Sequence, residues 1–150
     1  MKRIVILGTG GNCVDILETL RAINAAQASY SVTCAAGGYA VDLADLVLAP
    51  AGSTQGFISP DLKSNAVIKS GYKVSLAADA TKGVTNISSP AATCNVSTGQ
   101  PVSSYFANAD PVTLNGTGTR FFATDTRGTI FYDNAATVAN PIPAAQTVVQ

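Results

Sequence analysis

The sequence lacks histidine entirely and carries few charged residues. Without histidine, Ser-His-Asp and Cys-His catalysis, the usual zinc sites and histidine-based proton transfer are excluded. Charged residues make up 12% of the chain, with 9 Lys and Arg against 9 Asp and Glu. Zero net charge without a basic cluster argues against nucleic acid as a specific ligand, because nucleic acid is held mainly through its phosphates.

Long apolar runs are missing as well. No segment approaches the roughly 20 apolar residues that span a bilayer. The opening run Ile4–Leu7 follows Lys2 and Arg3 and stops at Gly8, so it is shorter than the roughly 7–15 apolar residues of a signal peptide. We therefore expect neither an export signal nor a membrane anchor in this chain.

What remains is a chain of 150 residues, 47% of them hydrophobic, which suits a single domain with its own core. Its 3 cysteines, Cys13, Cys34 and Cys94, contain no CxxC spacing. Two interpretations stay open at this point. Either Cys34 and Cys94 form a disulfide and Cys13 is left over, or all three are buried thiols of a cytosolic protein.

The N-terminal half is predicted to be mainly helical. We expect a short buried strand over residues 2–7, a glycine-rich turn over 8–12 and a helix over 13–31. Within this helix, one stripe contains Leu17, Leu20, Asn24 and Ala28. Gly37 and Gly38 should break the helix, and a second short helix is expected over 42–48.

The C-terminal half is predicted to form strands. Residues 72–76 alternate apolar and polar side chains, and further strands are expected over 105–107, 120–124 and 129–132. Residues 108–111 should end the strand over 105–107, and residues 125–128 should form a hairpin turn with Gly128 at a positive φ. From Asn140 onward we expect a surface loop. The whole chain is therefore predicted to be an α+β domain, with a helix packed on an antiparallel sheet.

The glycines of the opening suggest a phosphate site. Gly8, Gly10 and Gly11 follow a predicted strand and precede a helix, as in dinucleotide-binding turns, although the third glycine of the fingerprint falls at Cys13. Residues 2–23 also resemble the start of bacterial sugar-nucleotide acyltransferases. That resemblance implies a nucleotide-sugar-binding βα unit, but no hexapeptide repeats follow. The alternative is a strand, turn and helix without a ligand.

A different resemblance covers residues 20–150. The segments that carry it, in order, are Leu20–Tyr30, Cys34–Tyr39, Leu43–Leu46, Phe57–Leu62, Lys69–Tyr72 and the hairpin Gly118–Ile130. Together they resemble the globular part of bacterial type IV pilins, whose spine helix leads into a cysteine and a Gly-Gly-Tyr segment. This resemblance implies a spine-helix remnant over 20–36, an αβ-loop region over 37–68, and an antiparallel sheet with a tail over 69–150.

The pilin resemblance also carries functional expectations. It implies a structural subunit of an extracellular cell-surface filament, built from copies of itself and acting without catalysis, cofactor or metal. It further implies a Cys34–Cys94 disulfide. The helix face with Leu17, Leu20, Asn24 and Ala28 should pack against neighbouring subunits or the sheet. A minor pseudopilin of a type II secretion system is an alternative with the same fold.

Residues 1–19 depart from the pilin pattern. Pilins begin, after a leader ending in glycine, with Phe, a nearby glutamate and a long apolar helix, and this chain shows none of these. We therefore expect either an unusual or chimeric chain, or a partner in the form of a separate short apolar pilin subunit. The chain should reach a membrane only through an anchor that it does not itself contain.

Other polar residues are weak candidates for chemistry. Asp42 and Asp45 lie at positions i and i+3, which favours a solvated acidic face over a catalytic pair. Asp125, Asp133 and Asn134 offer oxygens to calcium but lack the EF-hand spacing, and capping of the hairpin explains Asp125 better. Nearby aromatic residues should alternate into the core; they are Phe121, Phe122, Phe131 and Tyr132.

Overall fold

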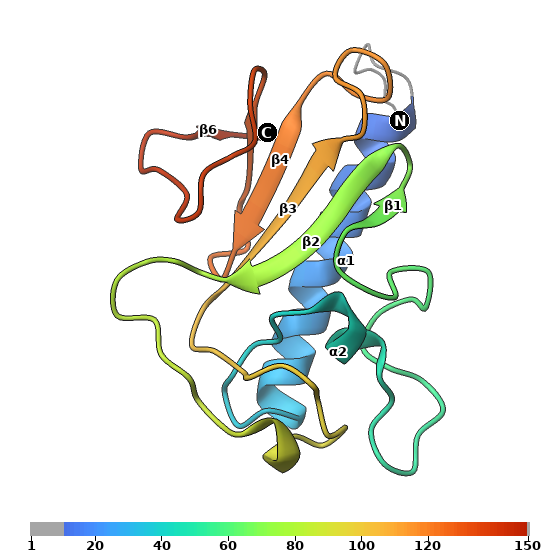
Figure 1. Cartoon of the computed structure of the whole chain (residues 1–150), viewed down its shortest axis with the longest axis vertical. Coiled ribbons are helices and arrows are strands. Elements are labelled where there is room, and N and C mark those ends of the chain that lie inside the picture. The colour runs from blue at the N-terminus through green and yellow to red at the C-terminus, as the bar shows by residue number, and fades with distance from the viewer. Residues whose placement is uncertain (1–10, 150) are drawn as a thin grey trace.

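The computed structural model describes residues 11–149, in which a long helix packs against one face of an antiparallel sheet (Figure 1). This confirms the expected α+β class. The strand expected over residues 2–7 lies outside the described residues. The elements are α1 (Gly11–Thr33), α2 (Leu43–Val47), β1 (Val67–Lys69), β2 (Tyr72–Ala78), the 3₁₀ turn η1 (Pro90–Ala92), β3 (Tyr105–Pro111), β4 (Phe121–Asp125), β5 (Ile130–Asp133) and β6 (Thr147–Val148).

Helix α1 begins within the expected glycine turn, at Gly11, and continues past Ser31 to Thr33. Its buried positions recur every three or four residues, as a one-sided helix requires. Ile16, Leu20 and Ile23 are fully buried against the sheet. The chain then turns away through Gly37, whose φ of 97° suits glycine.

The strands follow each other in the sheet in chain order, each antiparallel to its neighbour. In β2, Tyr72, Val74 and Leu76 are buried on the side of α1 and Lys73 is exposed, which confirms the predicted alternation. The opposite face has its own smaller core, in which Val138 and Ile142 of the C-terminal tail cover strand residues. Those covered residues are Phe106, Ala123 and Phe131.

Several strand boundaries differ from the expectation. Strand β3 continues to Pro111, so residues 108–111 do not end it. The reason is pairing on both sides: Asn108 lies opposite Ser75 of β2 and Ala123 of β4, and these ladders outweigh the turn preference of Asn and Asp. Strands β4 and β5 begin and end one residue later than predicted.

The turn between β4 and β5 is as predicted, because Gly128 has a φ of 77°. The tail is not only a loop. Its residues Thr147 and Val148 pair with β5 as the edge strand β6, and β1 forms the other edge. Neither short edge strand shows enough alternation in the sequence to be recognised.

Two amide side chains hold the connection between α1 and β2. Gln27 is buried in α1 and forms two hydrogen bonds with the backbone of Ala40, of 2.8 and 2.9 Å. Asn65 accepts hydrogen bonds from the backbone N–H of Leu43 and Leu76, and its amide donates to Val41 and Leu76. Each amide replaces a missing stretch of backbone pairing, so residues 37–66, apart from α2, are fixed without regular structure.

Candidate assembly surface

The outer face of α1 is not covered by the described part of the chain. Val14 is 40% exposed and Val32 is 83% exposed, and the exposed positions between them follow the helical period. After Arg21 this face has no charge; its residues are Ala22, Ala25, Ala28, Ser29, Val32 and Thr33. We call these six residues the outer face of α1. A smooth uncharged helix face can approach another helix closely.

The four residues predicted for subunit packing separate into two groups. Leu17 and Leu20 are buried in the core between α1 and the sheet of their own chain, which is one of the two kinds of packing expected for this face. Asn24 also faces the sheet: its amide donates to Thr124 Oγ1 at 3.1 Å, and its carbonyl oxygen accepts from the Tyr105 hydroxyl at 2.6 Å. Ala28 is exposed and belongs to the outer face. The face of α1 that the sheet buries is centred closer to Ile16, Ile23 and Tyr30.

A disulfide joins the C-terminal end of α1 to the segment before β3. Cys34 and Cys94 lie with their sulfur atoms 2.02 Å apart, and Cys13 is a buried free thiol. The backbone N–H of Cys94 also donates to the carbonyl of Cys34 at 3.0 Å. The pairing is the one that the pilin resemblance implies. It fixes the segment around Cys94 to the C-terminal end of α1.

Buried polar groups extend this unit. The Tyr30 hydroxyl lies 2.6 Å from Ser97 Oγ, which donates to Asn95 Oδ1 at 2.7 Å. The Asn95 amide donates to the carbonyls of Asp45 and Leu48. Burial raises the pKa of Tyr30, so its hydroxyl stays protonated. The chain of bonds connects α1, residues 93–99 and α2.

Asp42 and Asp45 do not form a solvated acidic face, and that expectation is wrong. Asp42 caps α2, accepting from the N–H of Ala44 at 2.9 Å. Asp45 is 1% exposed, and its carboxylate accepts from Thr98 N, Thr98 Oγ1 and Gly99 N at 2.8, 3.0 and 2.9 Å. These donors replace water around the charge, which is why the carboxylate can be buried.

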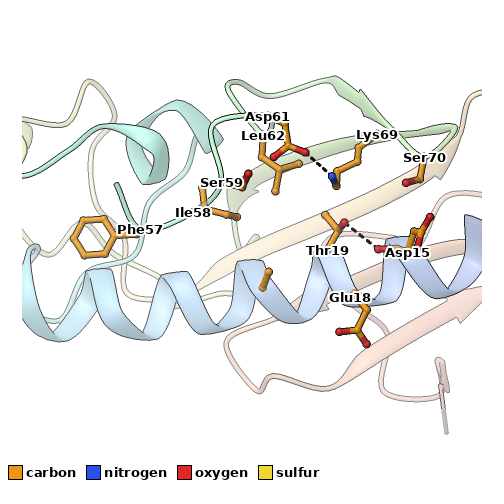
Figure 2. A pocket seen from close by; sticks show the side chains of 11 residues that line it. Asp15, Glu18, Thr19, Phe57, Ile58, Ser59, Asp61, Leu62, Lys69 and Ser70 are labelled. Atoms are coloured by element: carbon orange, nitrogen blue, oxygen red, sulfur yellow. Dashed lines mark hydrogen bonds and ion pairs between the residues drawn. The ribbon is translucent and has the colours of Figure 1, made fainter. Parts of the chain in front are cut away.

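An open groove of about 610 Å³ lies between the first half of α1, residues 57–62 and the end of β1. Its apolar lining includes Ala22, Phe57 and Ile58. Figure 2 shows the Asp61–Lys69 ion pair across from Asp15 of α1, with Phe57 at the other end. The hydrogen bond from Lys69 lowers the pKa of Asp61, so this acid stays charged. No sequence motif marked this groove, because the residues of α1 that line it are 35 or more positions from the other lining residues.

The other candidate sites are the glycines proposed for phosphate binding and the acids considered for calcium. Gly8 and Gly10 lie outside the described residues, and Gly11 is the first residue of α1. Asp125 caps the hairpin, accepting from the N–H of Arg127 at 3.0 Å and pairing with its guanidinium at 2.7 Å. Asp133 accepts from two backbone N–H groups, which lower its pKa. Within residues 11–149 there is no group of three metal-binding side chains.

The helices of the described part are not long and apolar enough to cross a bilayer. Comparison of the chain with known protein families, with curated proteins and with solved structures finds no match in any of the three.

Proposed function

We propose that this protein is a structural subunit of an extracellular pilus-like filament, of the type IV pilin kind, and that it acts by subunit packing and not by catalysis. The observation that carries the proposal is the one-sided packing of α1. One face of this 23-residue helix is buried on the sheet, while its outer face is uncharged and open. In a filament the outer face would be covered by the next subunit.

Two further features support the proposal. The disulfide and the hydrogen bonds of Asp45 fasten α2 and residues 94–99 to the C-terminal end of α1, and such cross-links suit a protein that is exposed in an assembly. The ordered resemblance to type IV pilins covers the same residues. Disulfides persist in oxidising compartments, which agrees with a position outside the cell.

The proposal also names partners. Copies of this chain would form the bulk of the filament. A separate short apolar helical subunit would supply the membrane anchor and filament core that pilins build from their N-terminal helix. No cofactor, metal or nucleic acid takes part in this function.

Electron microscopy of sheared cell-surface material, with mass spectrometry of the filaments, tests the proposal. We expect this chain as a dominant filament component with Cys34 and Cys94 oxidised. Recovery only at trace level, at filament ends, would indicate a minor pseudopilin instead. Recovery only in the cytosol with all three thiols reduced would overturn the proposal.

A further inference from the structure

The face of the sheet opposite α1 is covered over only part of its width. Val138 and Ile142 of the tail cover Phe106, Ala123 and Phe131 there. In Figure 1 α1 lies behind the sheet and the tail lies on the left, whereas β1 and the start of β2 lie on the right. Within residues 11–149, the β1 side of this face is therefore left bare.

Apolar side chains gather in the bare region. Ile68 is 57% exposed and Val112 is 54% exposed, and Phe121 is half-buried. Together with Lys73 and Asp110 they line a groove of about 290 Å³. We call these five residues the sheet patch. Apolar strand residues on the other half of this face are buried beneath the tail, so we expect the sheet patch to be stabilised by a cover as well.

The sheet patch carries one charge of each sign. Lys73 of β2 lies directly opposite Asp110 of β3, yet neither forms an ion pair with any described residue. Asp110 accepts a hydrogen bond from Thr137 Oγ1 at 3.0 Å. The nearby acid Asp133, opposite Phe121, accepts from two backbone N–H groups and does not line the groove. The sheet patch is thus neutral as a whole, with a positive and a negative end.

This arrangement of charges is complementary to itself. When two copies meet across a two-fold axis, a residue that contacts a second residue of the other copy is matched by the reverse contact. Lys73 of each copy can then lie beside Asp110 of the other, while the apolar side chains pack between them. A partner with charges of a single sign would place a like charge against either Lys73 or Asp110, which disfavours it.

We propose that two copies of this chain pair face to face through the sheet patch, with Lys73 of each copy beside Asp110 of the other. Antiparallel sheets commonly pack face to face. A two-fold contact of this kind closes on itself and does not extend a chain. It leaves the outer face of α1 free on the other side of the sheet, so the pairing goes beyond the proposed function and does not depend on it.

Sedimentation velocity of the full chain tests the pairing in solution. Because five side chains bury less than the roughly 1,600 Å² of a stable interface, we expect a reversible dimer that forms at high protein concentration. Ile68→Asp places an acid among the apolar side chains and should raise the dissociation constant at least about tenfold. A chain that stays monomeric up to millimolar concentration, or a dimer that Ile68→Asp leaves unchanged, would overturn the pairing.

Mixing two charge-reversed variants is a sharper test. A Lys73→Asp chain and an Asp110→Lys chain should each dimerise about tenfold more weakly alone, because each brings like charges together at both ends of the contact. Mixed together, they should form a heterodimer about as tight as the wild-type dimer, because both pairs are then opposite in sign. Weak association of this mixture would overturn the pairing.

The matched control is a Lys82→Asp chain mixed with the Asp110→Lys chain. The net charges are the same as in the first mixture, but Lys82 is exposed in the segment after β2 and does not line the groove. This mixture should associate weakly, because Lys73 of one copy meets the new lysine of the other. Equally tight heterodimers in both mixtures would show attraction by net charge alone and would overturn the pairing.

Filament yield separates failure of the pairing from failure of the proposed function. Ile68→Asp should lose the dimer and keep the normal filament yield, because assembly is proposed to bury the outer face of α1. A dimer that is lost in Val32→Asp and kept in Ile68→Asp would overturn the pairing and place the contact on α1. An intact dimer without any filament would support the pairing and count against the filament alone.

Discussion

At the scale of single residues, the position of Asp45 shows how burial depends on partners distant in sequence. The spacing of Asp42 and Asp45 predicts two similar acids on one helix face. Instead, Asp42 caps the helix and Asp45 is enclosed by Thr98 and Gly99. A buried carboxylate with three donors stabilises the loop that supplies them. If the carboxylate is removed, the buried donors are left without an acceptor, which costs free energy.

Replacing Asp45 by Asn should lower the free energy of unfolding by about 3 kcal/mol, because the new amide group points N–H donors at existing donors. Urea denaturation measures this change. Asp42→Asn is the control, since asparagine caps a helix as well as aspartate does, and it should be nearly neutral. Similar losses of unfolding free energy in both variants would show that the hydrogen bonds of Asp45 contribute no more to stability than the cap formed by Asp42.

Buried tyrosines make the protein sensitive to alkali. Burial raises the pKa of Tyr72 to about 12, and burial also raises the pKa of Tyr30 and Tyr105, against about 10 in an unfolded chain. Because the folded pKa is the higher one, the stabilisation is complete below pH 10 and is lost as the pH rises toward 12. Unfolding free energies measured between pH 8 and 12 should be level up to about pH 10 and fall above it, and Tyr72→Phe should reduce the slope of the fall. A slope unchanged in Tyr72→Phe would contradict this.

At the scale of elements, the disulfide connects the end of α1 to a segment without regular structure. It spans 60 residues, so its removal should cost up to about 4 kcal/mol in the chain-entropy model. We expect the Cys34→Ser/Cys94→Ser double variant to unfold at correspondingly lower urea concentration. Thiol labelling of the unfolded, unreduced wild-type chain should modify Cys13 alone; labelling of three cysteines would contradict the disulfide.

The elements that could be predicted from sequence are those with a strong local period. The alternation of β2 and the helical spacing of large apolar residues in α1, such as Ile16, Leu20 and Ile23, are visible because each element has one buried face. Edge strands β1 and β6, the covering of Phe131 by the tail and the groove are not visible, because they depend on contacts between distant segments. The same limit explains Leu17 and Leu20: periodicity identifies an apolar stripe but not whether a sheet or another subunit covers it.

At the scale of the whole molecule, the outer face of α1 is the surface that assembly should bury. Val32→Asp places a charge on this face at a residue that is 83% exposed, so the unfolding free energy should change by less than about 0.5 kcal/mol. Filament yield, counted by electron microscopy, should fall sharply. Val112→Asp, at an exposed residue beyond β3, is the control and should assemble normally. Normal assembly of Val32→Asp would place the subunit contact elsewhere.

The agreement between strand order and chain order bears on how the molecule is made. Each strand from β2 onward, as it leaves the ribosome or a translocation pore, finds its partner already present in the strand before it. The covalent ring closed by Cys34 and Cys94 includes β1 and β2 and none of the later strands, so it can close before β3 has emerged. The later strands can thus be added one at a time to the disulfide-closed segment that contains β1 and β2. No gap is left in the sheet for a late strand to fill.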